Sequence, residues 1–185
     1  MSLINITNEE KKILIEVARK SIDIKLNSNK SIDLKSLSKK YEIFNKKYGV
    51  FVTLKINQKL RGCIGNIIGY LPLIEGVYNL AQSSAFEDPR FNKLTLEELD
   101  KIKIEITILS ELIEVKKIEE IKIGRDGLYL KLGLNSGVFL PQVPVEQNWD
   151  LSEYLNQLSY KAGLTPNCYK ENYELSRFEG LIIQE

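Results

Sequence analysis

The segment GVFVTLKINQKLRGCIGNI, residues 49–67, decides the fold of this chain. Its first part is rich in β-branched and aromatic residues, and Asn57, Gln58 and Lys59 separate it from LRGCIG, residues 60–65. Two runs of this kind joined by a three-residue connection predict a β-hairpin. The hairpin raises a question about Cys63: the thiol either reacts, or it is a small apolar side chain that a crowded strand accepts.

Helices are predicted on both sides of the hairpin. Thr7 or Asn8 can cap an opening helix, whose apolar positions recur at helical spacing: Ile13, Leu14, Val17, Ala18 and Ile22. A second helix of about four turns is expected from Pro72 to Asp88, since proline suits a first turn and Pro89 disfavours helical geometry in the residue before it.

The second half of the chain repeats these element types. Residues 102–112 alternate isoleucines with polar residues, which predicts a half-exposed strand, and residues 124–140 predict strand, turn and strand. Asp150 and Glu153 resemble a capping box for a helix that ends at Gly163, and residues 173–185 predict a closing strand. Because helices and strands mix without regular βαβ alternation, we expect an α+β fold with mainly antiparallel sheets.

Composition limits the class of protein. The chain has 185 residues, 43% of them hydrophobic, which suits one compact core or two intimately packed lobes. With 26 basic and 25 acidic residues the net charge is +1, so no long-range field would concentrate nucleic acid or an anionic membrane. No apolar run is long enough to span a bilayer, and the first residues lack the order of a secretory signal. We therefore expect a cytoplasmic protein.

The chain contains no histidine, and this excludes several kinds of site. A Ser-His-Asp or Cys-His nucleophile, a His-ligated zinc and an imidazole proton shuttle all require one. Cys63 and Cys168 do not make a zinc or iron–sulfur site by themselves, and we expect them to be free thiols. We predict no metal site, although carboxylates for a hard cation remain the one plausible type.

The glycines around Cys63 allow more than one interpretation. If no bulge intervenes, strand alternation places Cys63 on the face of Arg61 and Gly65, where an arginine would favour the thiolate. The alternative is a buried, inert thiol. Gly62, Gly65 and Gly69 also lie between a strand and a helix, but their spacing matches no phosphate-binding motif, so turns explain them at least as well.

Two further segments carry candidate residues. In FEDPRF, Glu87, Asp88 and Arg90 either form a rigid corner at a helix end or line a cleft beside the Cys63 strand. Only five arginines occur, so arginine in a tight turn suggests bidentate pairing that lysine would not provide. In LPQVPVEQNW, Gln142 and Glu146 could be presented to a ligand by a loop that two prolines hold in shape, or the loop could be anchored by Trp149.

Several segments together resemble the AMMECR-one protein family: LRGCIG, DPRF, GRDGLYL, LPQV with a downstream tryptophan, KAGL and RFEG. The resemblance runs from about Gly49 to the C-terminus. It implies a single domain over residues 1–185, built from two similar β/α halves that exchange strands, with an extra N-terminal helix and a C-terminal strand. It also implies that LRGCIG lies near a groove between the lobes. Ser159 stands where the family usually has a cysteine.

The resemblance implies no agreed activity and no cofactor, but prokaryotic members are grouped with a Memo-like protein and a radical SAM protein. Our first hypothesis is a non-catalytic binding or accessory protein. Its groove would hold a small ligand, a peptide or one of those partners through residues of the segments above: Arg61, Gly62, Cys63, Gly65, Glu87, Asp88, Arg90, Gln142 and Glu146.

Two alternatives remain at this point. The protein could be an enzyme with Cys63 as nucleophile, Arg61 or Arg90 stabilising the thiolate and Glu87 carrying protons. A weaker alternative is a regulator linked to nucleic-acid processes. The near-neutral charge makes nucleic acid an improbable direct partner.

Overall fold

The computed structural model of the protein describes residues 4–27, 31–166 and 173–185. The chain forms two compact units, one from Met1–Leu109 with Leu181–Glu185 and one from Ser110–Gly180. Each unit combines helices with a four-stranded sheet, and the strands of the central pairings run antiparallel. The predicted α+β class is confirmed.

The sheet of the first unit has the strand order β2-β1-β3-β8. Its strands are β1 (Gly49–Ile56), β2 (Lys59–Asn66), β3 (Lys103–Leu109) and β8 (Gly180–Gln184). The expected hairpin is β1 and β2, with a two-residue turn in place of the three residues that the sequence suggested. Asn57 and Gln58 both have positive φ, which is typical of a type I′ turn and matches the twist of the two strands.

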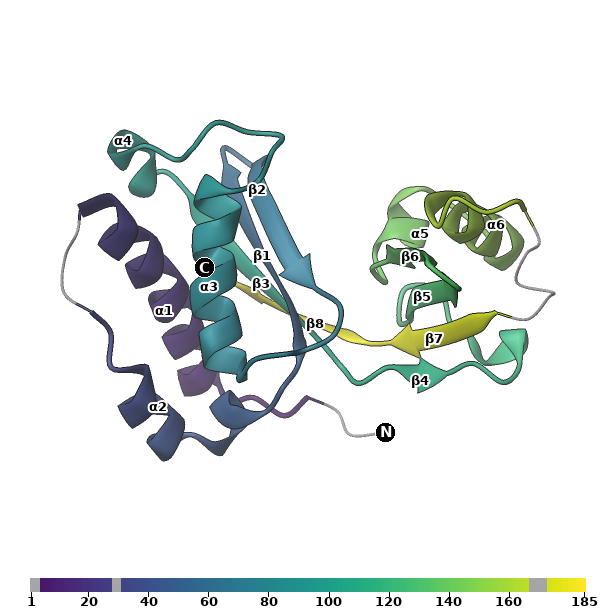
Figure 1. Ribbon diagram of the computed structural model, residues 1–185, viewed down its shortest axis with the longest axis horizontal. Coiled ribbons are helices and arrows are strands. Elements are labelled where there is room, and N and C mark those ends of the chain that lie inside the picture. Colours follow the sequence, from purple (N-terminus) through teal and green to yellow (C-terminus); the bar gives the residue numbers. More distant parts are fainter. Residues whose placement is uncertain (1–3, 28–30, 167–172) are drawn as a thin grey trace. The chain divides into compact units, whose positions relative to one another are not determined.

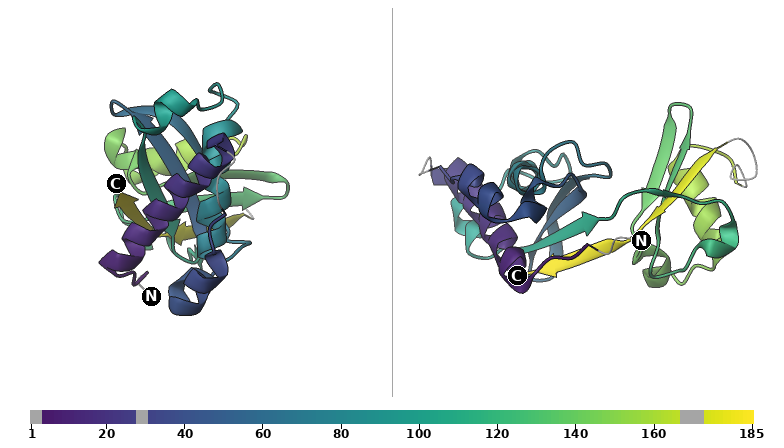
Figure 2. Two further views of the ribbon diagram at one scale, coloured as in Figure 1. Left: turned by 90° about the vertical axis from the view of Figure 1, so that its left-hand side faces the viewer. Right: turned by 90° about the horizontal axis from the view of Figure 1, so that it is seen from below.

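Two long helices, α1 (Asn8–Asn27) and α3 (Leu73–Phe86), cover one face of this sheet (Figure 1), and α1 crosses in front of the strands in the left view of Figure 2. The strand residues that face them are fully buried, including Val52, Leu54 and Ile106. Shorter helices complete the unit: α2 (Leu34–Lys40), η1 (Glu42–Asn45) and α4 (Leu96–Leu99). The opposite face of the sheet therefore carries the alternate residues of each strand.

The ends of the two long helices follow the sequence closely. Thr7 and Glu10 form a reciprocal capping pair at the start of α1. Helix α3 begins after Pro72, as expected, but ends at Phe86, two residues before the predicted end. Glu87 has already left helical geometry with φ −127°. This earlier end frees Asp88 to turn toward the sheet.

The second unit contains a sheet of order β4-β7-β5-β6. Its elements are β4 (Ile113–Glu114), η2 (Ile118–Glu120), β5 (Gly127–Leu132), β6 (Asn135–Phe139), α5 (Val143–Glu146), α6 (Leu151–Lys161) and β7 (Glu174–Phe178). Leu128, Leu130, Tyr154 and Leu158 form its buried core. Asp150 caps α6 as expected, accepting from the Glu153 backbone N–H.

The closing strand predicted over residues 173–185 is two strands. β7 belongs to the sheet of the second unit and β8 to that of the first, with Glu179 between them. The hydrophobic pattern runs on through both strands, so it could not reveal that the chain changes sheets.

Candidate functional site

The LRGCIG segment forms most of β2, which is an edge strand of the first unit's sheet. The pairing passes from Leu54 opposite Gly62 to Lys55 opposite Leu60, so Arg61 has no partner on β1. This irregularity is a β-bulge. The expectation that Arg61 and Cys63 share a face depended on the absence of a bulge, and that condition is not met.

Two glycines of β2, Gly62 and Gly65, and Gly69 in the loop after it allow close packing against their neighbours. A Cβ atom on Gly62 would lie 2.1 Å from the carbonyl oxygen of Ser84 in α3, and one on Gly65 would lie 2.3 Å from the ring of Phe51. On Gly69 it would lie 2.5 Å from the backbone of Tyr48. All three glycines are thus required by close approach within the protein, which accounts for them without a phosphate ligand.

Ser84 joins α3 to the hairpin. Its hydroxyl accepts from the Ile64 backbone N–H at 2.9 Å and donates to the Val52 carbonyl at 2.7 Å. Val52 and Ile64 are register partners, so the hydroxyl bridges two residues of neighbouring strands. A side chain from the helix has become part of the strand pairing, which fixes the position of β2 relative to α3.

The DPRF segment binds the backbone of Cys63. The Asp88 carboxylate accepts from the Cys63 N–H at 2.8 Å, and Arg90 Nη2 donates to the Cys63 carbonyl at 3.1 Å. The two side chains also pair with each other through two short hydrogen bonds. Together they make the two hydrogen bonds that a further strand would make with an edge residue, and so they close this part of the edge.

The electrostatics of this pair are set by its hydrogen bonds, which outweigh the effect of burial. The Asp88 side chain is 1% exposed, whereas that of Arg90 is 56% exposed. Hydrogen bonds from Arg90 hold the pKa of Asp88 far below its usual range, against the effect of burial. Asp88 is therefore ionised at every physiological pH, and it serves as an acceptor rather than as an acid.

Arg61 forms a second bidentate pair, with Glu98 of α4. Its Nε and Nη2 donate to the two carboxylate oxygens at 2.7 and 2.8 Å, and its Nη1 donates to the Asn92 carbonyl. The hydrogen bonds from Arg61 lower the pKa of Glu98 to about 2. Both arginines near Cys63 thus donate to a carboxylate and to a backbone carbonyl. This bidentate pairing is possible for the planar guanidinium of arginine but not for lysine.

The Cys63 thiol lies on the face of the sheet opposite the helices. Its Sγ is 3.2 Å from Oγ1 of Thr53, its register partner on β1. The residue is partly buried. A hydroxyl can share a hydrogen bond with a thiol but is a poor proton acceptor, so this contact does not activate a nucleophile.

The other candidate residues lie elsewhere. The Glu87 carboxylate accepts from Ser83 and lies 3.4 Å from Lys25 Nζ, and these contacts lower its pKa. Gln142 and Glu146 belong to the second unit, where Gln142 precedes α5 and Glu146 is its exposed last residue. The groove expected between the lobes stays a prediction.

Sequence reasoning missed Ser84, Glu98 and Thr53. A signal existed for Glu98, because Thr95 and Glu98 form a capping box at α4. No sequence signal marked Ser84, whose role depends on the helix packing against the hairpin. Cys168 lies outside the described residues.

A family profile described as AMMECR1 matches residues 15–183 of the chain. This chain belongs to the AMMECR1 family. The resemblance that rested on LRGCIG, DPRF and the later motifs is thereby confirmed, and the site around Cys63 is part of an AMMECR1-family fold.

Relatives and a solved structure agree with this assignment. Protein MJ0810 of Methanocaldococcus jannaschii is 44% identical and covers 97% of this chain and 92% of its own length. Protein PYRAB00100 of Pyrococcus abyssi is 39% identical, with the same coverage. The crystal structure of the uncharacterized protein PH0010 from Pyrococcus horikoshii superposes with a TM-score of 0.85 at 36% identity, over 97% of this chain and 93% of that one.

The described residues, 4–27, 31–166 and 173–185, contain neither a candidate metal site nor a candidate membrane span. Among these residues, no group of three or more Asp, Glu, Cys or His side chains lies close enough together to hold a metal ion. Within the same residues, every helix is too short or too polar to cross a bilayer.

Proposed function

We propose that this AMMECR1-family protein is a non-catalytic binding or accessory protein, and that the surface around LRGCIG in its first unit recognises the partner. One observation carries the proposal: Asp88 and Arg90 hold the Cys63 backbone, while Arg61 is held by Glu98. Strong polar groups here fix the shape of a strand instead of pointing at a reacting atom. A strand whose shape is already fixed loses little conformational entropy when it binds a partner, which favours recognition.

Arg90 is the group best placed to contact a partner. Its side chain is 56% exposed although its guanidinium is oriented by Asp88. Arginine oriented in this way is frequent among residues that dominate binding energy. We infer that the protein acts in the cytoplasm, and that the Memo-like and radical SAM proteins suggested by the family resemblance are the first partners to test.

The enzyme alternative has one feature in its favour, a partly buried thiol on the helix-free face of the sheet. It requires a proton acceptor within reach of Cys63. In the described residues, the side-chain hydrogen-bond contact of this thiol is with the Thr53 hydroxyl. The nucleic-acid alternative draws no support from the net charge of +1. Binding is the function that the geometry supports best.

The test mixes the purified protein with each companion and measures complex mass by size-exclusion chromatography with light scattering. We expect a stoichiometric complex with one of them, and at least a tenfold weaker one for Arg90→Ala. Arg125→Ala is the matched control, since it also breaks an arginine–aspartate pair but lies in the second unit. Separate elution of all components, or equal weakening by both variants, would contradict the proposal.

A further inference from the structure

A cavity of about 310 Å³ lies beside the LRGCIG strand, within the first unit. Its walls come from the end of β2, from residues 68–71 of the following loop and from one face of α3. Ile64, inside the LRGCIG segment, lines it directly, with Val50 of β1. The volume is at the lower end of the range for ligand sites, so it suits one or two side chains rather than a large cofactor.

The lining of this cavity is uncharged. None of the described residues that line it is acidic or basic, although 28% of the chain is charged. Asn66 and Asn79 contribute solvent-exposed carboxamides, each of which can both donate and accept. Donor and acceptor side by side, with no charge, match the amide group of a peptide backbone.

Gly76 leaves the α3 wall of the cavity open. It is the fourth residue of α3 and lines this cavity, and a Cβ atom added there would meet no atom within 4 Å. Glycine weakens a helix interior relative to alanine. The close approaches that explain Gly62, Gly65 and Gly69 are missing here, so a larger side chain at this position would project into the cavity.

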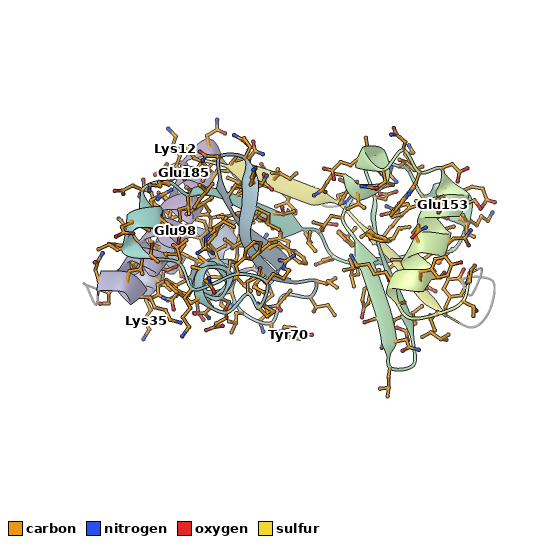
Figure 3. All side chains as sticks on the ribbon, turned by 90° about the horizontal axis from the view of Figure 1, so that it is seen from above. Lys12, Lys35, Tyr70, Glu98, Glu153 and Glu185 are labelled. Carbon is orange, nitrogen blue, oxygen red and sulfur yellow. The ribbon has the colours of Figure 1, made fainter. Side chains whose placement is uncertain are left out.

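The rim of the cavity is apolar and exposed. Ile68, Tyr70 and Leu71 expose 46%, 68% and 42% of their surface, and all three belong to the loop between β2 and α3. Figure 3 shows Tyr70 at the surface of the first unit. An exposed apolar patch around a mainly apolar, uncharged cavity is typical of a protein recognition site, where tyrosine is enriched.

We propose that this cavity binds a short, uncharged peptide segment of a partner, with one apolar side chain inserted toward Ile64 and Gly76 and its backbone amides paired with Asn66 and Asn79. The inference deepens the proposed binding function and rests on it. It names the chemistry of the recognised segment, and it adds a site on the helix side of β2, next to the loop at residues 68–71.

The experiment titrates isotopically labelled protein with N-acetyl-leucine N-methylamide and follows backbone and side-chain amide resonances. We expect saturable shifts in the millimolar range at Tyr70, Asn66 and Asn79. The corresponding aspartate and lysine derivatives should bind at least tenfold more weakly. Gly76→Leu, which fills the cavity, should weaken binding of the leucine probe at least tenfold. Glu75→Leu, which places the same side chain on the neighbouring position of α3, should leave it unchanged.

Several results would overturn the inference: no localised shifts, equal binding of the charged probes, or equal binding by the Gly76→Leu protein. The two proposals can fail separately. If Gly76→Leu still forms the partner complex while Arg90→Ala does not, binding around LRGCIG stands and the cavity is not part of it. If the probe binds as expected but neither companion does, the cavity is a peptide site and the named partners are wrong.

Discussion

Each unit contains a buried aspartate held by an arginine, and the two pairs do different things. Asp88 and Asp126 expose 1% and 0% of their side chains, and each forms two hydrogen bonds with a partly exposed arginine, Arg90 or Arg125. Each also accepts a backbone N–H, from Cys63 in one case and Lys122 in the other. The hydrogen bonds are of the same kind, but the two aspartates differ in how far along the sequence the bound N–H lies.

Asp126 closes a turn, because Lys122 is only four residues away, whereas Asp88 reaches 25 residues back to the LRGCIG strand. Asp126 also lies 3.8 Å from the guanidinium of Arg177, whose Nε and Nη1 are buried without a hydrogen-bond partner among the described residues. The second pair therefore stabilises the core of its own unit. The first pair positions an edge strand, which is why we connect it with function.

The largest effect is expected from breaking the second pair. Asp126→Asn leaves Arg177 buried without its counter-charge, and this should lower the free energy of unfolding by about 3–5 kcal/mol. Asp88→Asn should cost only about 1–2 kcal/mol, because Arg90 is exposed enough to turn to solvent. Urea unfolding followed by Trp149 fluorescence reports the second unit, and circular dichroism reports both. An equal or larger loss for Asp88→Asn would contradict this difference between the two pairs.

The next largest loss of stability is expected at two glycines that let a helix approach a strand. A Cβ on Gly62 would lie 2.1 Å from the Ser84 oxygen, and one on Gly137 would lie 2.9 Å from backbone atoms of α6. Gly62→Ala should destabilise by about 2–3 kcal/mol and Gly137→Ala by about 1–2 kcal/mol, as overpacking does. Thermal unfolding of the two variants measures the order. The reverse order would contradict the tight seating of β2 on α3.

The smallest of these effects depends on pH. Because Arg61 lowers the folded-state pKa of Glu98 from its ordinary 4.5 to about 2, the pair stabilises the fold above pH 4.5 and loses that contribution as pH falls toward 2. Glu98→Gln should cost about 1 kcal/mol at pH 7, allowing for solvent screening, and close to nothing near pH 2. Glu97→Gln, at the exposed neighbouring residue, is the control. Urea midpoints across this pH range provide the measurement, and a cost that does not change with pH would contradict the pairing.

The sequence predicted most elements because their signals are local. The hairpin, the capped helices and the alternation in residues 102–112 all follow from neighbouring residues, and they are present. It also predicted that arginine in DPRF would pair bidentately. It could not predict the Ser84 bridge, the bulge at Arg61 or the division of the tail between two sheets. These depend on which segments meet in space, and no residue pattern within a segment specifies that.

The central claim is that LRGCIG is a positioned recognition strand and that Cys63 is not a nucleophile. The most direct test is the rate of Cys63 alkylation by iodoacetamide at pH 6.5 in a Cys168→Ser background. Because the nearby guanidiniums are held by carboxylates and the thiol contacts a hydroxyl, folded protein should react no faster than glutathione. The rate should rise when urea unfolds the chain. Alkylation of the folded protein at ten or more times the glutathione rate would mean an activated thiolate, and the enzyme alternative would replace the binding function.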